Sequence, residues 1–353
     1  MSMSTRVKLV ALIVAISLIP AVVMLVVTAV ALGQPQSAAT WASLPAIAGL
    51  AAVVAGGRRF AVIVAFVMSF LAPLTIVAGT SPVSGAALMA LLALTVGRLS
   101  RFGLHRSASM VPVMLAWPLI NPPAWSGQVV VDRDDTVYLL WMAGIFFVGA
   151  IFPAIVVPLL MRKRTRPQPQ THTREDAMVY TVMITVLATV STFYVLDHPE
   201  MYGGAFLIAA IFMLAPIGGA QTLQPTLVRI VSTVAGSVFV LAILSQVDSL
   251  LGVYLVGLVC IVIALMAKFG PHSWVYFAFM LPATACLNST TVAQVGQLSK
   301  QRVVDNVVGG VLILLASGLA IAYSHWATTH GHADDEDPET LGLLDAPHPA
   351  AVA

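Results

Sequence analysis

The feature that most constrains this chain is a succession of apolar runs, most of them close to 20 residues long, separated by short breaks that hold charge, proline or glycine. A helix needs about 20 apolar residues to cross a bilayer, whereas a spanning strand needs about ten in alternation. Only 9% of the 353 residues are charged and 59% are apolar, which is too little charge to cover a water-facing surface. The pattern therefore predicts an all-α, polytopic membrane helical bundle and argues against a soluble enzyme.

Reading the runs against their breaks predicts twelve spans. Four of them are short and bear proline or glycine, so both full spans and re-entrant segments remain open for 41–57, 107–122, 204–220 and 273–288. The first run, 9–32, is longer than the core of a secretory signal, which favours a span over a cleaved leader. The remaining predicted spans are 60–79, 83–100, 137–161, 177–196, 226–245, 249–268 and 303–324.

Basic residues sort to one side of these spans. With the N-terminus inside, all of the 17 Lys and Arg residues except Arg133, Lys300 and Arg302 fall on the inner side. The positive-inside rule then predicts a protein of the cytoplasmic (inner) membrane with both termini in the cytoplasm. The outer loops hold acidic residues instead, namely Asp132, Asp134, Asp135, Asp197, Glu200 and Asp248.

A polar, basic and proline-containing stretch divides the chain into two halves. The predicted domains are a first six-span unit (1–161), a cytoplasmic linker (162–176), a second six-span unit (177–324) and an acidic tail (325–353), for which the composition predicts disorder. Because each unit has an even number of spans, the two would face the same way. Parallel repeats of this kind recur in secondary transporters, with the substrate route between them.

Matching positions in the two halves support this internal repeat. A basic residue opens the third span of each half, Arg59 in the first and Arg229 in the second, and both are candidates for binding a substrate carboxylate. The fifth span of each half carries a proline and then ends at an asparagine, Asn121 or Asn288. Prolines break helices, and broken helices expose backbone groups that can line a cavity. The two asparagines are therefore predicted substrate contacts, and ordinary helix termination is the alternative interpretation.

Two motifs supply the other candidate residues. The spacing of Arg229, Thr233 and Gly236 places them on one helix face. This face is interpreted either as a motif for helix packing or as a cytoplasmic vestibule in which the arginine binds a carboxylate. Arg302 and Asp305, at the outer end of the last predicted span, are either a local salt bridge or a site in which Asp305 carries a proton. Passive or potential-driven movement of an anion remains open beside proton coupling.

These motifs resemble those of the fusaric acid resistance (FUSC) and aromatic acid exporter family. That family opens its third span with Arg-x-x-Gly-Thr-x-x-Gly and its sixth with Arg-x-x-Asp-Thr-x-x-Gly; here Ser232 replaces the first glycine and Asn306 the second threonine. The likeness extends over residues 6 to 324. The glycine and threonine of the motif do not follow Arg59, and the soluble domain that many relatives carry between the halves is missing. The resemblance implies export of small aromatic or other organic acids and, by analogy, a homodimer.

Other function classes find little support. No Walker A, HExxH or GxSxG motif occurs, which predicts no enzyme, no cofactor and no metal site. A net charge of +2 without a basic stripe predicts no nucleic-acid partner. Cys260 and Cys286 are interpreted as small buried hydrophobes, and His105 as a loop residue. His198 lies in an outer turn, and a pH switch is a possible role for it that nothing else in the sequence supports. A membrane scaffold that transports nothing is the rival function, favoured by the scarcity of charge within the spans.

Overall fold

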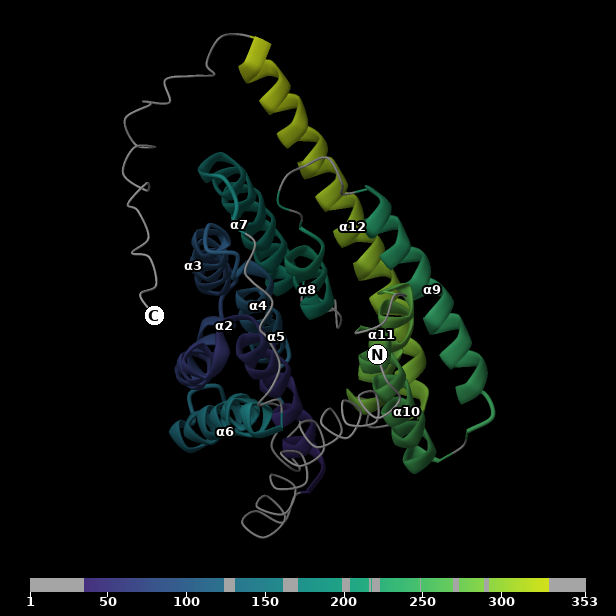
Figure 1. Ribbon diagram of the computed structural model, residues 1–353. Coiled ribbons are helices and arrows are strands. Elements are labelled where there is room, and N and C mark those ends of the chain that lie inside the picture. Colours follow the sequence, from purple (N-terminus) through teal and green to yellow (C-terminus); the bar gives the residue numbers. More distant parts are fainter. Residues whose placement is uncertain are drawn as a thin grey trace, which may run out of the picture.

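The computed structural model describes residues 35–123, 131–160, 171–198, 204–215, 217, 223–247, 249–268, 273–288 and 292–329 (Figure 1). Every regular element in these ranges is a helix, which confirms the all-α class. The predicted first span and most of the predicted linker and acidic tail lie outside the described residues.

The helices are α2 (Pro35–Ala78), α3 (Pro82–Ser100), α4 (His105–Ala108), α5 (Met110–Ile120), α6 (Thr136–Leu160), α7 (Arg174–Asp197), α8 (Gly204–Leu214), α9 (Leu223–Leu244), α10 (Leu250–Lys268), α11 (Ser273–Asn288) and α12 (Val292–Thr329).

Five of the described helices are long and apolar enough, by length and composition, to cross a membrane. They contribute the segments Leu44–Ala78, Pro82–Ser100, Thr136–Pro158, Arg174–Asp197 and Val295–Ala322. The chain is therefore a membrane protein with several apolar helices. The predicted total of twelve spans and the predicted repeat remain predictions.

The predicted boundary between the second and third spans coincides with a kink in the structure. Both spans lie in α2, which is interrupted at Gly57 by a non-helical conformation with φ 82° and ψ −173°. Glycine adopts a positive φ without the penalty that a Cβ would bring. The break therefore falls where the pair Gly56–Gly57 predicted the end of a span, but the chain continues at once as helix.

Two other boundaries differ from the sequence prediction. The predicted span 107–122 is divided into the single turn α4 and the helix α5, with Ser109 between them. The last helix starts at Val292 and not at residue 303. An apolar run ends at a charge, but a helix does not, because Gln, Lys and Arg are good helix formers.

Small residues bring α2 and α6 together in the first half of the chain. A Cβ on Gly149 of α6 would overlap the carbonyl oxygen of Ala42, and one on Gly49 of α2 would overlap that of Ala150. Close backbone approach of this kind is typical of helix pairs in membranes, where apolar burial from water does not drive association. These helices form the main buried core together with α3, α5, α7 and α8, whereas α9, α10, α11 and α12 pack as a second group (Figure 1).

Helices α3 and α7 pack antiparallel, which gives their assembly two distinct ends. Gly85 near the start of α3 meets Leu196 near the end of α7, and Gly97 meets Thr181 at the other end. At the first end, Nη1 of Arg133 donates to the carbonyl oxygens of Ile76 (3.2 Å) and Leu119 (3.3 Å). These carbonyl groups lie at the C-terminal ends of α2 and α5, where the helix dipole attracts a cation.

Candidate functional site

A row of polar side chains is buried on one face of α12. Ser299, Arg302, Asp305 and Asn306 are all buried, and Arg302 has no exposed surface at all. Their spacing of three and four residues places them on the same side of the helix. The opposite face exposes apolar side chains such as Val304, Val308, Val311 and Leu315. Helix α12 therefore turns Arg302 and Asp305 toward protein and valines and leucines outward, as is typical of ionisable residues in membrane helices.

The guanidinium of Arg302 is held over aromatic rings from two other helices. Its Cζ lies 3.6 Å from the ring centroid of Phe206 in α8 and 5.9 Å from that of Trp117 in α5. The two rings pack edge to face with centroids 4.5 Å apart. A cation over a desolvated aromatic face gains about 2 kcal/mol, which offsets part of the cost of burying the charge.

Two groups with ionisable side chains accompany Arg302. The carboxylate of Asp305, one turn along α12, interacts with it electrostatically. The thiol of Cys286 on α11, which is also buried, lies close enough to do the same. The site is thus assembled from α5, α8, α11 and α12, and it joins the fifth helix of the first half to the second half.

Acceptor atoms beside Arg302 retain unused capacity. The amide Nδ2 of Asn306 donates to the backbone oxygen of Arg302 at 2.8 Å. Within the described part of the chain, Oδ2 of Asp305, Oδ1 of Asn306 and Oγ of Ser299 make no hydrogen bond. Buried acceptors without a donor are costly and uncommon in folded proteins. The cluster is therefore suited to take up a proton or a ligand that brings donors.

Close helix packing frames this site. A Cβ on Gly236 of α9 would overlap the carbonyl oxygen of Ala278 in α11, and a Cβ on Gly309 of α12 would lie 2.8 Å from that of Ala210 in α8. Thr233 is fully buried one turn before Gly236. The packing interpretation of the motif glycine is confirmed, with α11 as the partner helix.

The structure unites only part of the predicted set. Arg302 and Asp305 share the buried face of α12 and interact electrostatically, inside the apolar segment of that helix. Arg59 is exposed on α2. Asn121 is half-buried at the end of α5, where its backbone N–H donates to the oxygen of Trp117 at 2.8 Å. The side chains of two other candidates lie outside the described residues, although their helices are described: Arg229 and Asn288.

Sequence reasoning missed four contributors to the site. Phe206 and Trp117 gave no signal, because aromatic residues are common in membrane helices and these two are far apart in sequence. Cys286 was interpreted only as a small hydrophobe. Ser299 could have been found, since it precedes Arg302 by three residues and extends the same polar helix face.

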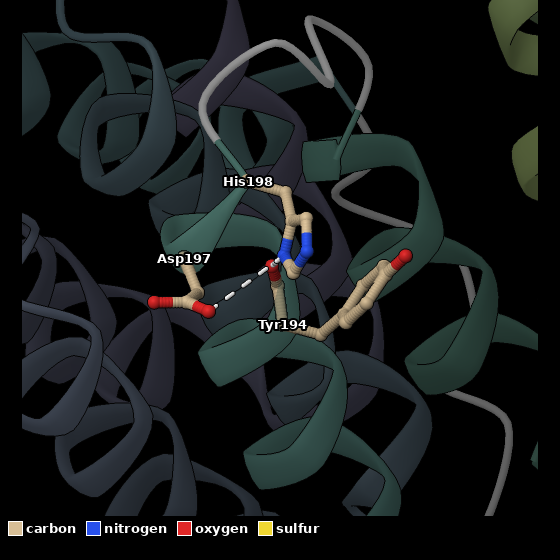
Figure 2. Close-up of polar contacts among 3 residues, drawn as sticks. All are labelled: Tyr194, Asp197 and His198. Carbon is tan, nitrogen blue, oxygen red and sulfur yellow. Dashed lines mark hydrogen bonds and ion pairs between the residues drawn. The ribbon is translucent and has the colours of Figure 1, made fainter.

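His198, a candidate pH switch, caps its own helix (Figure 2). Its Nδ1 lies 2.9 Å from the carbonyl oxygen of Tyr194 and 3.9 Å from Oδ2 of Asp197. Its ring stacks on that of Tyr194 with centroids 4.3 Å apart. All of these contacts are local to the last turn of α7, and the switch hypothesis stays a prediction.

His105 is not a solvated loop residue, as the sequence had suggested, but a buried one. Its ring packs edge to face against His172 (5.3 Å between centroids) and Tyr180 (5.7 Å). Burial, helped by His172 and the charge of Arg106, lowers the pKa of His105 from 6.5 to about 4. The folded protein therefore holds this imidazole neutral at physiological pH.

We expect acid to destabilise the protein through His105. Between pH 6.5 and 4 the unfolded chain binds a proton at His105 and the folded chain does not. The contribution of neutral His105 to the free energy of unfolding is therefore full above pH 6.5 and is lost as the pH falls toward 4. It amounts to at most about 3 kcal/mol. Thermal unfolding in detergent should show a lower midpoint at pH 4.5 than at pH 7, and His105→Phe should reduce the difference. If His105→Phe keeps the full difference between the two pH values, the assignment is contradicted.

Comparison with known proteins gives one match. Residues 185–316 match the family model described as fusaric acid resistance protein-like. No curated protein and no solved structure matches the chain. The matched range contains Phe206, Thr233, Gly236, Cys286 and the Arg302–Asp305 pair, and it covers the later part of the range over which the motifs predicted the resemblance. Residues 185–316, and with them most of the Arg302 site, are therefore similar to the fusaric acid resistance protein-like family.

Proposed function

We propose that this protein exports small organic acids, aromatic ones first, across the cytoplasmic membrane, and that the Arg302 site binds them on the way. One observation carries the proposal: a fully buried arginine stands inside an apolar helix within the family-matched segment. A charge in that position is expensive, and such residues in membrane proteins mark substrate or ion pathways. The family description itself points to resistance against an organic acid.

The chemistry of the site suits a carboxylate attached to a ring. A guanidinium binds a carboxylate through two parallel hydrogen bonds in its plane. The face of the Arg302 guanidinium is already covered by Phe206, which leaves the edge of the plane for the carboxylate. An aromatic ring on the same substrate would pack against Trp117 and Phe206, since aromatic pairs gain about 0.5–1.5 kcal/mol beyond simple burial.

Asp305 would couple binding to protons. While Asp305 is ionised, its negative charge competes with a substrate carboxylate for Arg302. Protonation of Asp305 removes this competition, so anion binding and proton uptake by Asp305 favour each other. A proton bound with the anion would leave with it, against an inward proton gradient, so this coupling makes transport depend on pH but does not drive export. The membrane potential, negative inside, moves an anion outward by itself.

Transport into everted vesicles tests both parts of the proposal. Vesicles with the protein should accumulate members of a panel of aromatic acids faster than vesicles without it, and the rate should respond to an imposed pH gradient. We expect Asp305→Asn, which mimics the protonated carboxyl, to remove the response to pH. Asp134→Asn, a change at an exposed acid, should keep it. Fluxes that ignore the presence of the protein would end the transporter hypothesis. If the transport rate of Asp305→Asn still responds to the pH gradient, Asp305 is not the residue that couples transport to protons.

A further inference from the structure

Four exposed arginines lie at the end of the α3–α7 pair where Gly97 meets Thr181. Arg98 lies in the last turn of α3, Arg101 follows it, Arg106 lies in α4 and Arg174 begins α7. The antiparallel packing of α3 and α7 brings Arg98 and Arg101 to the start of α7.

Contacts between α4 and α7 bring Arg106 to the same place. The ring of His105 packs on Tyr180 of α7, and Arg106 interacts electrostatically with both. We call Arg98, Arg101, Arg106 and Arg174 the arginine cluster.

The protein supplies little negative charge to these arginines. None of the four makes an ion pair in the part of the chain that the structure describes. Of the two acids in the first turn of α7, Asp176 is engaged locally, because its Oδ2 accepts from Oγ1 of Thr173 at 2.8 Å. The preceding sequence, 161–170, holds four basic residues and no acid. This end therefore carries four arginines against Glu175 and Asp176, a net positive charge, whereas the opposite end carries Asp132, Asp134, Asp135 and Asp197.

Exposed apolar side chains continue from the arginine cluster along the same two helices. Leu91 and Leu94 of α3 and Met178 and Val182 of α7 are all more than a third exposed. A soluble anion needs only the charges. A phospholipid needs both parts, a cationic place for its phosphate and an apolar wall for its acyl chains. Because the arginine cluster adjoins an exposed apolar surface, a phospholipid fits this region better than a soluble anion does.

We propose that the arginine cluster is a binding site for the phosphate headgroup of an anionic phospholipid, whose acyl chains lie along the exposed faces of α3 and α7. Arginine is suited to this because its fork binds phosphate oxygens bidentately. Basic pockets between membrane helices are known to hold lipids with anionic headgroups in this way. The site is separate from Arg302 and does not depend on the transport proposal.

Native mass spectrometry of the full chain in detergent tests the site, with phosphatidylglycerol as the anionic probe and phosphatidylcholine, which is zwitterionic and has no net charge, as the reference. We expect the wild type to retain phosphatidylglycerol and the double variant Arg98→Gln, Arg174→Gln to bind it about tenfold more weakly. Arg58→Gln, Arg59→Gln is the matched control, because it removes two exposed arginines beside Gly57. It should stay within twofold of the wild type, and circular dichroism checks that both variants fold.

Two results would overturn the proposal. Equal loss in the two double variants would mean that general attraction to basic residues holds the lipid, without a site. Displacement of the lipid by millimolar inorganic phosphate would mean that the cluster binds soluble anions and that the apolar wall contributes nothing.

Discussion

Replacing Arg302 by alanine is expected to lower the transport rate of organic acids roughly 100-fold or more, because two charge-assisted hydrogen bonds to the carboxylate are lost. Arg302→Lys keeps the charge but not the planar fork or the stacking on Phe206, so we expect it to recover only part of the activity. Lys300→Ala is the matched control. It removes an exposed charge two residues earlier on the same helix and should transport like the wild type.

A double variant separates the loss of a substrate contact from damage to the fold. Arg302→Ala alone leaves Asp305 buried near no cation, which is destabilising, whereas removal of both charges is often nearly neutral. Arg302→Met with Asp305→Asn should therefore unfold at a temperature close to that of the wild type and still fail to transport. Wild-type transport by this stable double variant would show that the pair is a structural salt bridge and would remove Arg302 from the substrate route.

Gly236→Ala should destabilise the protein by about 1–3 kcal/mol, the usual cost of overpacking. The new methyl group would overlap the carbonyl oxygen of Ala278, and backbone cannot move aside as a flexible side chain can. Helices α9 and α11 would have to separate, and α11 carries Cys286 next to Arg302. We therefore expect both a lower unfolding midpoint and slower transport.

Gly318→Ala gives the matched control for this substitution. A Cβ on Gly318 of α12 meets no atom within 4 Å, and alanine is the better helix former by about 0.5–1 kcal/mol. Its unfolding midpoint in detergent should equal or exceed that of the wild type. If Gly236→Ala and Gly318→Ala unfold at the same temperature, the close approach of α9 to α11 does not support the fold.

Sequence reasoning located helices better than it located their ends. Apolar runs of helical length identified nearly all the described helices, because the bilayer imposes both length and composition on a spanning segment. It misplaced the start of α12 because Arg302 ended the apolar run. It correctly separated the two parts of α2 at Gly57, where the chain breaks its helical conformation for one residue.

The pattern of residues by itself determined that this chain is a helical membrane protein, that Arg302 and Asp305 share a helix face, and that Gly236 packs against a neighbour. These properties depend on composition and on spacing within one helix, which the sequence contains in full. Only the tertiary structure decided that Arg302 lies over Phe206 and near Trp117 and that four arginines meet beside α4. Contacts between helices depend on which faces pack together, and no periodicity within a single helix encodes its partner.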